Sequence, residues 1–262
     1  MNAKNITLFA LLIPICPVVT SCGGSGSGNP TTGNTQTAQP LPPASATPGG
    51  IWTGADSKTG LAVTVLIGED GVFDEIRSDN AQFYGTLSFN ANSFNARVTG
   101  LPQYGTEFSD GSRHGAGTAS GAYSPQSQMS VTINFKTDAG TSSTSTLKLS
   151  FNSAYLIVPN VQSIAGNYTD QSGVVVTIWS DGTIYAQSPL TGCVVNGNVH
   201  PVTGNYSLYA PLISYENCTD ASAPLNNLDF DGLMAVVGST VIVGMHDKVG
   251  MGYGLVYILT KE

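Results

Sequence analysis

Charged residues are scarce in this sequence, and basic residues especially so. Lysine and arginine number 9 and aspartate and glutamate 17 in 262 residues, so that 10% of the chain is charged and the net charge is −8. Proteins that bind nucleic acid need clustered lysine and arginine to neutralise phosphates. We therefore expect no nucleic-acid partner. With 31 glycines, the composition is more typical of an exported β protein than of a cytosolic enzyme.

The motifs of common enzymes are also missing. No Gly-x-Ser-x-Gly elbow supports a Ser-His-Asp triad, and no glycine-rich phosphate loop follows a strand and opens a helix. His114 lies near Asp110 and Ser112, which leaves a hydrolase site as one hypothesis. We expect the three histidines, His114, His200 and His246, to be solvated polar residues in loops. We expect no catalytic residue and no cofactor.

One pair of carboxylates stands out. Asp229 and Asp231 alternate along a run that is typical of a strand, so both would lie on one face. They could bind calcium or act as acid and base, but the third spaced acid and the distal glutamate of a calcium loop are absent. We expect them to be edge-strand carboxylates that discourage aggregation, and we expect no metal site.

Long helical periodicity is absent, and short alternating runs take its place. Leu61, Val63, Val65 and Ile67, for example, share one face of their run. Alternation of this kind predicts half-buried strands. We expect roughly eight strands in the first half, near 51–54, 61–68, 71–78, 81–90, 93–100, 115–124, 127–136 and 144–152, and a matching set from 164 to 261.

The second half repeats the first at a spacing of about 110 residues. Residues 50–54 resemble 165–170, and residues 62–73 resemble 175–184. Both longer segments share a Val-Thr core and then Asp-Gly, a dipeptide that predicts a type I′ hairpin turn because it accepts positive φ angles. Further matches keep the same order: Gly85 with Gly197, Phe94 with Tyr206, and Gly121 with Gly232. The series indicates a duplication.

We expect each set of strands to close into a barrel, because an open sheet would leave its edge strands unpaired. Eight antiparallel strands with short loops can close into a barrel, which removes the edges. The chain is therefore expected to be all-β, with two tandem eight-stranded antiparallel β-barrels, one in residues 51–158 and one in residues 159–262. A pair of β-sandwiches or one joint sheet stays open, because hairpin patterns do not fix closure.

Strands of the second half carry apolar residues on both faces, as in 174–179 and 255–259. A sheet that is apolar on both sides needs cover on both sides. Packing of the second half against the first is the expected explanation. The alternative is an exposed apolar patch that binds a partner or lipid.

Two of the four cysteines form a natural pair. Cys16 lies in the apolar start of the chain and Cys22 at its end, which leaves Cys193 and Cys218. In an exported chain the two are expected to form a disulfide that staples a hairpin turning near 203–205, with a bulge to absorb the offset. A metal site is the alternative, but two cysteines without a paired histidine make a poor one.

The chain starts with Lys4 and an apolar run from 6 to 20 that Pro14 and Pro17 interrupt. This run is too short for a lasting transmembrane helix and is typical of a signal peptide, which we place at residues 1–21. Residues 23–50 contain no charged residue and almost no large apolar one. Such a segment cannot bury enough surface to fold, so residues 22–50 are predicted to be a flexible tether.

The small residues Thr20 and Ser21 are followed at once by Cys22. With Val19 they resemble the lipobox of bacterial lipoproteins. The resemblance implies that Cys22 carries lipid, palmitate included, and becomes the first residue of the mature protein. Gly23 stands where lipoproteins retained in the inner membrane often have aspartate, so the resemblance implies the outer membrane. Periplasmic and cell-surface sides both stay open.

The whole chain resembles the uncharacterised lipoproteins of Gram-negative bacteria, and its expected two-lobed architecture is similar to that of surface lipoproteins such as transferrin-binding protein B. The leading hypothesis is a non-enzymatic lipoprotein, anchored by the lipid on Cys22, that binds a protein or another macromolecular partner of the envelope. One alternative is a carrier of a small apolar ligand inside a barrel. Another is an envelope hydrolase that uses His114 or the Asp229 and Asp231 pair.

Overall fold

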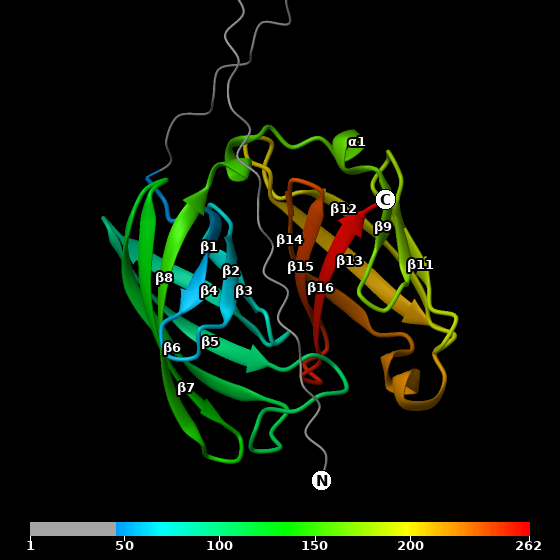
Figure 1. Ribbon diagram of the computed structural model, residues 1–262, viewed down its shortest axis with the longest axis horizontal. Helices are drawn as coiled ribbons and strands as arrows, with labels where there is room; N and C mark the ends of the chain where they lie inside the picture. The colour runs from blue at the N-terminus through cyan, green and yellow to red at the C-terminus, as the bar shows by residue number, and fades with distance from the viewer. Residues whose placement is uncertain (1–45) are drawn as a thin grey trace, which may run out of the picture. The chain divides into compact units, whose positions relative to one another are not determined.

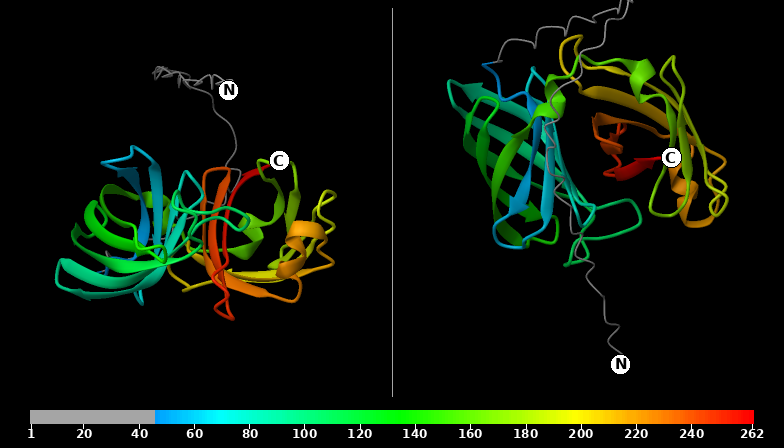
Figure 2. Two further views of the ribbon diagram at one scale, coloured as in Figure 1. Left: turned by 90° about the horizontal axis from the view of Figure 1, so that it is seen from below. Right: turned by 45° about the horizontal axis from the view of Figure 1, so that its top comes forward.

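The computed structural model describes residues 46–262, which form two closed antiparallel barrels of eight strands each (Figures 1 and 2). The expected fold class is confirmed, and neither sandwiches nor a joint sheet are formed. The predicted signal peptide, Cys22 and most of the predicted tether lie outside the described residues. No helix of the described part is long and apolar enough to cross a membrane.

Strands β1 to β8 follow one another around the first barrel, and β1 closes it by pairing with β8. The predicted strands lie within a few residues of the observed ones. Their bounds are Gly50–Asp56 (β1), Ala62–Ile67 (β2), Val72–Arg77 (β3), Gln82–Asn90 (β4), Ser93–Leu101 (β5), Gly115–Ser124 (β6), Gln128–Thr137 (β7) and Ser142–Asn152 (β8).

A short linker contains the 3₁₀-helix η1 (Ser153–Leu156) and the single-turn helix α1 (Val161–Ile164). The second barrel then closes where β16 pairs with β9, and a 3₁₀-helix, η2 (Asp220–Leu225), lies between β13 and β14. Its strands are Gly166–Thr169 (β9), Val175–Ile178 (β10), Thr183–Gln187 (β11), Val194–Pro201 (β12), Tyr209–Glu216 (β13), Asp229–Val237 (β14), Thr240–Asp247 (β15) and Gly254–Lys261 (β16).

The folded part begins slightly before the end of the predicted tether. Gly50 already belongs to β1, and the hydroxyl of Thr47 donates a hydrogen bond to Glu69. The carbonyl of Pro48 accepts a hydrogen bond from the indole of Trp52 at 3.0 Å. These contacts fasten the entry of the chain to the first barrel.

The two Asp-Gly pairs do sit in hairpin turns, but the predicted turn type is wrong. Gly71 and Gly182 have φ angles of 86° and 90°, whereas neither preceding aspartate has a positive φ. The amide of Gly71 donates to the carbonyl of Gly68, as expected for a type I turn followed by a left-handed glycine bulge. Only the glycine of each pair therefore needs the left-handed conformation.

The sequence repeat has a counterpart in the strand register. Trp52 pairs with Val65 on β2, and Tyr168 pairs with Val176 on β10. Both aromatic rings are fully buried, and each donates a hydrogen bond to the carbonyl four residues earlier. The two barrels thus start from the same local structure.

Register supports one later sequence match and corrects two. Gly85 and Gly197 occupy equivalent ladder positions, because each pairs with the second residue after a turn glycine. Counting along the next strand, Phe94 corresponds to Tyr209 and not to Tyr206. Gly121 pairs with Phe94 as Met234 pairs with Tyr209, so Gly232 lies two residues from the position predicted for it. The sequence offset between equivalent residues therefore changes from 112 at Gly85 to 115 at Phe94 and 113 at Gly121, while the strand pairing is kept.

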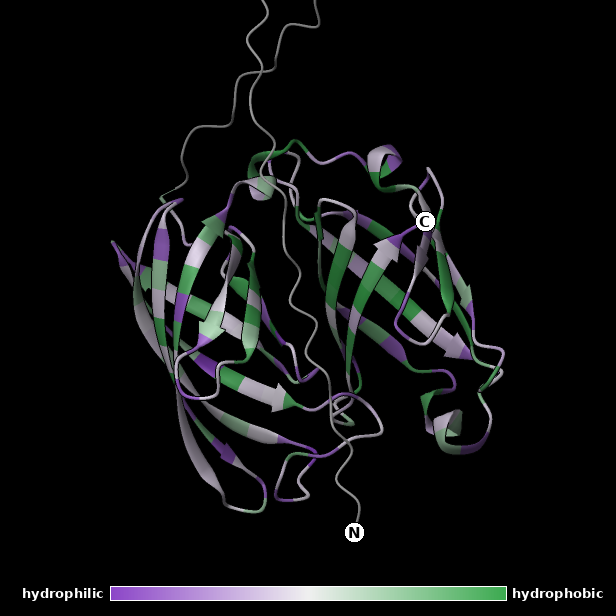
Figure 3. Ribbon diagram, in the orientation of Figure 1, coloured by the Kyte–Doolittle hydropathy of each residue, from purple (hydrophilic) through white to green (hydrophobic). Residues whose placement is uncertain are grey.

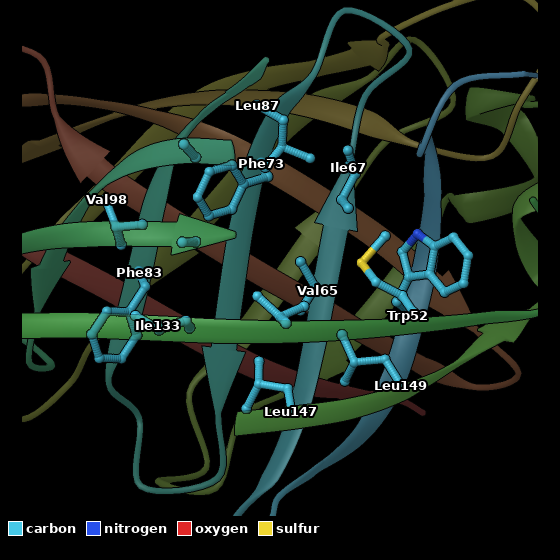
Figure 4. Packing of buried hydrophobic residues seen from close by; sticks show 14 of the residues in the cluster. Trp52, Val65, Ile67, Phe73, Phe83, Leu87, Val98, Ile133, Leu147 and Leu149 are labelled. Atoms are coloured by element: carbon cyan, nitrogen blue, oxygen red, sulfur yellow. The ribbon is translucent and has the colours of Figure 1, made fainter. Parts of the chain in front are cut away.

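Each barrel encloses its own apolar core, as the alternating hydropathy along the strands indicates (Figure 3). In the first barrel, Trp52, Phe73, Phe83 and Leu147 point inward from separate strands (Figure 4). A third cluster joins the barrels and contains Ile51, Leu66, Ile76, Tyr155, Leu233 and Val256.

The expected packing of the second half on the first is therefore confirmed for β14 and β16. Leu233 and Val256 are buried in the joint cluster, and the ring of Tyr155 stacks on that of Tyr206 with centroids 4.7 Å apart. The apolar residues of β10 and of the turn after it are not covered in this way, because Val175 and Trp179 remain 42% and 46% exposed. The outer face of β10 is thus an apolar surface.

Candidate functional site: a cavity in the second barrel

The second barrel is hollow around two positions where its inward side chains are smaller than those of the first barrel. Phe73 on β3 and Phe83 on β4 fill the first barrel (Figure 4). Strand register places Ile184 on β11 at the position of Phe73, and Val195 on β12 at the position of Phe83. Two aromatic rings are thus replaced by aliphatic side chains. Cavities open where side-chain volume is removed and the backbone does not collapse.

The difference leaves a cavity of about 250 Å³ inside the second barrel. The interior of the first barrel holds only about 20 Å³. The walls of the larger cavity are mostly apolar and include Val176, Ile184, Ile213, Met234, Val243, Met245 and Leu259. A cavity of this kind is the usual setting for a small apolar ligand.

Polar side chains gather where the cavity opens. Asp170 and Ser172 come from the turn between β9 and β10, and Ser188 and Thr191 come from the loop between β11 and β12. The carboxylate of Asp170 accepts hydrogen bonds from the amides of Ser172 and Val174, each at 2.8 Å, which fixes this turn. At the opposite end, Ile164 of α1 is buried in the barrel core. The cavity therefore has a polar mouth and an apolar floor.

Two hydroxyl groups form the polar feature inside the wall. The hydroxyls of Tyr215 on β13 and Tyr257 on β16 lie 2.5 Å apart, and both residues line the cavity. Burial raises the pKa of each, and the negative charge of Asp170 adds to the effect. Both tyrosines are therefore neutral near pH 7 and keep their hydroxyl protons for hydrogen bonding.

The first barrel contributes to the mouth of this cavity. Its loop between β5 and β6 places Gln103 and Tyr104 in the cavity lining. The side chain of Gln103 accepts from the amide of Val256 at 2.7 Å, and the hydroxyl of Tyr104 donates to the carbonyl of Ala221 at 2.8 Å. The rings of Tyr104 and Tyr253 make an edge contact. The loop thus crosses from β16 to η2 as a strap.

The predicted disulfide is formed and also borders the cavity. Cys193 and Cys218 are joined across a separation of 25 residues, and Cys193 lies in the cavity lining. They flank β12 and β13 at the ends remote from the turn. Asn217, which lies between the end of β13 and Cys218, has a left-handed φ of 57°. The bond ties together the two loops that border the mouth.

The chain matches no known protein-family model and no curated protein sequence. The function of the cavity must therefore be inferred from its geometry.

Two buried carboxyl groups, absent from the sequence predictions, lie on β3. Asp74 faces the second barrel, where its two oxygens accept from the side chain of Gln82 at 2.7 Å and from the amide of Leu233 at 2.9 Å. The second bond satisfies an amide in a gap of the β13–β14 ladder, where neither Pro211 nor Leu233 is paired across the two strands. Burial raises the pKa of Asp74 to about 7, against the effect of these hydrogen bonds.

Glu75, the next residue, points into the first barrel and occupies the position that Ala186 has in the second. It is 2% exposed, and its Oε1 has no hydrogen-bond partner. Burial raises the pKa of Glu75 to about 8, although Arg77 acts in the opposite direction. The side chain is thus mainly neutral at pH 7.

The predicted loop setting of the histidines is wrong for His200 and His246. His200 is an exposed residue of β12. His246 lies on β15, where its ring stacks on that of Tyr84 from the first barrel at 3.8 Å and an interplanar angle of 13°. Burial lowers the pKa of His246, against the attraction of Asp231 and Asp247. This side chain is therefore part of the contact between the barrels.

His114 does lie in a loop, but it is not joined to the serine of the hypothetical triad. Its Nδ1 lies 3.1 Å from the carboxylate of Asp138. The hydroxyl of Ser112 accepts from the amide of Ala139 instead, and Asp110 accepts from the hydroxyl of Thr137. The described contacts therefore hold this loop against β7 and bring no nucleophile to the histidine.

The edge-strand role predicted for Asp229 and Asp231 is wrong. Both lie on β14, which pairs with β13 and β15 in a closed barrel that has no edge. The carboxylate of Asp231 lies 3.7 Å from His246 and 3.7 Å from Lys248. Within residues 46–262 no three His, Cys, Asp or Glu side chains gather as potential metal ligands.

Proposed function

We propose that the protein is a binding protein for a small apolar molecule, which it holds inside the second barrel. The observation that carries this proposal is the contrast between a cavity of about 250 Å³ in one barrel and about 20 Å³ in the other. A cavity of about 150 Å³ is known to hold benzene. By proportion, the second barrel has room for about ten non-hydrogen atoms.

The lipid anchor expected on Cys22 fits this role. Two or more acyl chains give stable membrane attachment. The anchor would hold the cavity beside an outer membrane, where apolar molecules concentrate. Labelled palmitate should enter the wild-type protein in cells and should not enter a Cys22→Ala variant. Equal absence of label from both would remove the anchor from the proposal and leave the cavity unaffected.

The methionines offer a direct test of binding. Met234 and Met245 line the cavity, whereas Met129 lies in the packed core of the first barrel. The protein is labelled with ¹³C at its methionine methyl groups and titrated with n-butylbenzene, which has ten carbon atoms. We expect saturable shifts of the Met234 and Met245 signals and none of Met129. Unchanged cavity methyl signals would refute ligand binding in the second barrel.

A cavity-filling variant serves as the matched control. Val195→Phe gives the second barrel the aromatic residue that the first barrel carries as Phe83. The variant should fold and lose the butylbenzene-dependent shifts. Retention of the same affinity in Val195→Phe would show that the probe binds elsewhere.

A macromolecular partner remains a second candidate because of one specific surface. Val175 and Trp179 on the outer side of the second barrel are 42% and 46% exposed, and the ring of Tyr185 lies beside Trp179. Exposed apolar residues that cluster in this way favour a contact surface. Crosslinking in intact cells should yield a discrete adduct with the wild type that a Trp179→Ala variant fails to form. Identical adducts from both would reject this surface.

A further inference from the structure

The pair of tyrosine hydroxyls supplies one unused proton. The hydroxyls of Tyr215 and Tyr257 lie 2.5 Å apart and share one hydrogen bond. Two hydroxyl groups have two protons, and only one of them is used between the rings. The described residues offer no further hydrogen-bond partner to either hydroxyl. The remaining proton is therefore available to an oxygen atom inside the cavity.

The surroundings of this pair disfavour an anion. Residues 159–262 contain two lysines and no arginine, and neither lysine lines the cavity. Lys248 lies beside Asp231, and Lys261 donates to the carbonyl of Ala165 at the opposite end of the barrel. The nearest charge is the carboxylate of Asp170, whose field acts on both tyrosines. A ligand carboxylate at the pair would meet repulsion and no counter-ion.

A cationic group is disfavoured for a different reason. Asp170 already accepts hydrogen bonds from the amides of Ser172 and Val174 and from the hydroxyl of Ser172. Its carboxylate is therefore held in the turn at the mouth, away from the apolar interior. A cation that reached the tyrosine pair would lie among apolar walls without a direct partner, which carries a large desolvation cost.

We propose that the ligand is an uncharged apolar molecule of about ten non-hydrogen atoms with one oxygen, a hydroxyl or carbonyl group, that binds at the Tyr215 and Tyr257 hydroxyls. This inference rests on the proposed function and adds the chemical class of the ligand. The oxygen lies on the mouth side, because Tyr215 is the next-to-last residue of β13 and adjoins the loop to η2. The apolar part extends toward Val241 and Leu259 at the other end of the cavity.

The test compares three probes of nearly equal size: 1-octanol, octanoate and octylamine. Each is titrated by calorimetry at pH 7 into the wild type and into the double variant Tyr215→Phe with Tyr257→Phe. Tyr185→Phe is the control, because its hydroxyl bonds Gln187 and does not line the cavity. Butylbenzene, which has no oxygen, is titrated into all three proteins.

We expect 1-octanol to bind the wild type and Tyr185→Phe at least about tenfold more tightly than either charged probe. The double variant should lose about three- to tenfold in affinity for 1-octanol, the usual effect of one neutral hydrogen bond. Its affinity for butylbenzene should stay within about twofold of the wild type.

The possible failures are distinguishable. If butylbenzene binds the wild type but octanoate or octylamine equals 1-octanol, the cavity is a binding site and the inferred ligand class is wrong. The same conclusion follows if the double variant keeps its full affinity for 1-octanol. If no probe binds the wild type, the proposed function itself fails.

Discussion

Phe73 and Phe83 of the first barrel occupy the ladder positions of Ile184 and Val195 in the second. Around these positions the strand pairings agree, and the aromatic residues at the barrel entrances make equivalent hydrogen bonds. What differs at these two positions is the volume of the side chains that point inward. One barrel is therefore solid and the other hollow, although their strands are paired in the same way.

This difference suggests that the two barrels have different roles, one in support and one in binding. The solid barrel supplies a rigid support, and the strap at Gln103 and Tyr104 extends from it to the mouth of the cavity. The hollow barrel gives up packing contacts, each of which would have stabilised the fold. The disulfide between Cys193 and Cys218 and the contacts with the first barrel offset this loss of stability.

The largest effect is expected when the two pairs of side chains are exchanged between the barrels. Phe73→Ile with Phe83→Val removes aromatic volume from a filled core and should lower the free energy of unfolding by at least about 3 kcal/mol. The reciprocal change, Ile184→Phe with Val195→Phe, should cost less than about 1 kcal/mol because the cavity accepts the rings. Urea denaturation of both double variants measures the difference. Equal costs would mean that the second barrel is not hollow in solution.

The disulfide should matter almost as much, and only for the second barrel. Closing a loop of 25 residues stabilises a fold by about 3 kcal/mol through the entropy of the unfolded chain. In Cys193→Ser with Cys218→Ser, amide exchange should therefore accelerate in β9 to β16 and remain slow in β1 to β8. Equal acceleration in both barrels would show that they unfold as one unit.

The positions of the strands, and the residues of each strand that face inward, were predictable from the sequence. Alternation around Val63 and Val65 identifies the inner face of β2, and the one cysteine pair left in a chain that is expected to be exported indicates the disulfide. The cavity was not predictable, although the repeat already sets Phe73 against Ile184. Whether an exchange of Phe for Ile leaves a cavity depends on which side chains lie across the closed barrel. Those side chains come from strands far away in the sequence, so a local pattern does not reveal them.

The contacts that connect the barrels were hidden for a similar reason. Asp74 looks like a solvent-facing residue of an alternating strand, and its role appears only in the fold, where Leu233 is not paired with β13 and its amide donates to Asp74 instead. His246 belongs to a strand whose outer face is covered by Tyr84. Tyr104 lies in a loop, where no periodicity indicates its partner. Each of these residues contacts a segment more than a hundred positions away.

A pH experiment sharpens the comparison through Glu75, which has an alanine, Ala186, as its counterpart. The folded pKa of Glu75, about 8, lies above its ordinary value, so the folded state binds more protons than the unfolded state between those values. Stability is then highest at low pH within this window and falls as pH rises. Between pH 7 and pH 8 the wild type should lose about 1 kcal/mol.

Glu75→Gln should remove most of this loss, because the neutral amide does not titrate. Asp74→Asn should retain it, since the pKa of Asp74 is about 7 and most of its effect occurs at lower pH. Denaturation curves at pH 6, 7 and 8 for the three proteins provide the measurement. A pH dependence that persists in Glu75→Gln would assign it to another group.

The smallest expected effect concerns the strap. Tyr104→Phe keeps the edge contact with Tyr253 and removes only the hydrogen bond to the carbonyl of Ala221, which should cost about 1 kcal/mol or less. Because η2 borders the mouth, the loss should appear as faster amide exchange in residues 219–226 and faster release of 1-octanol. Tyr185→Phe should change neither. If Tyr104→Phe leaves both rates unchanged, the first barrel supports the second without controlling access to its cavity.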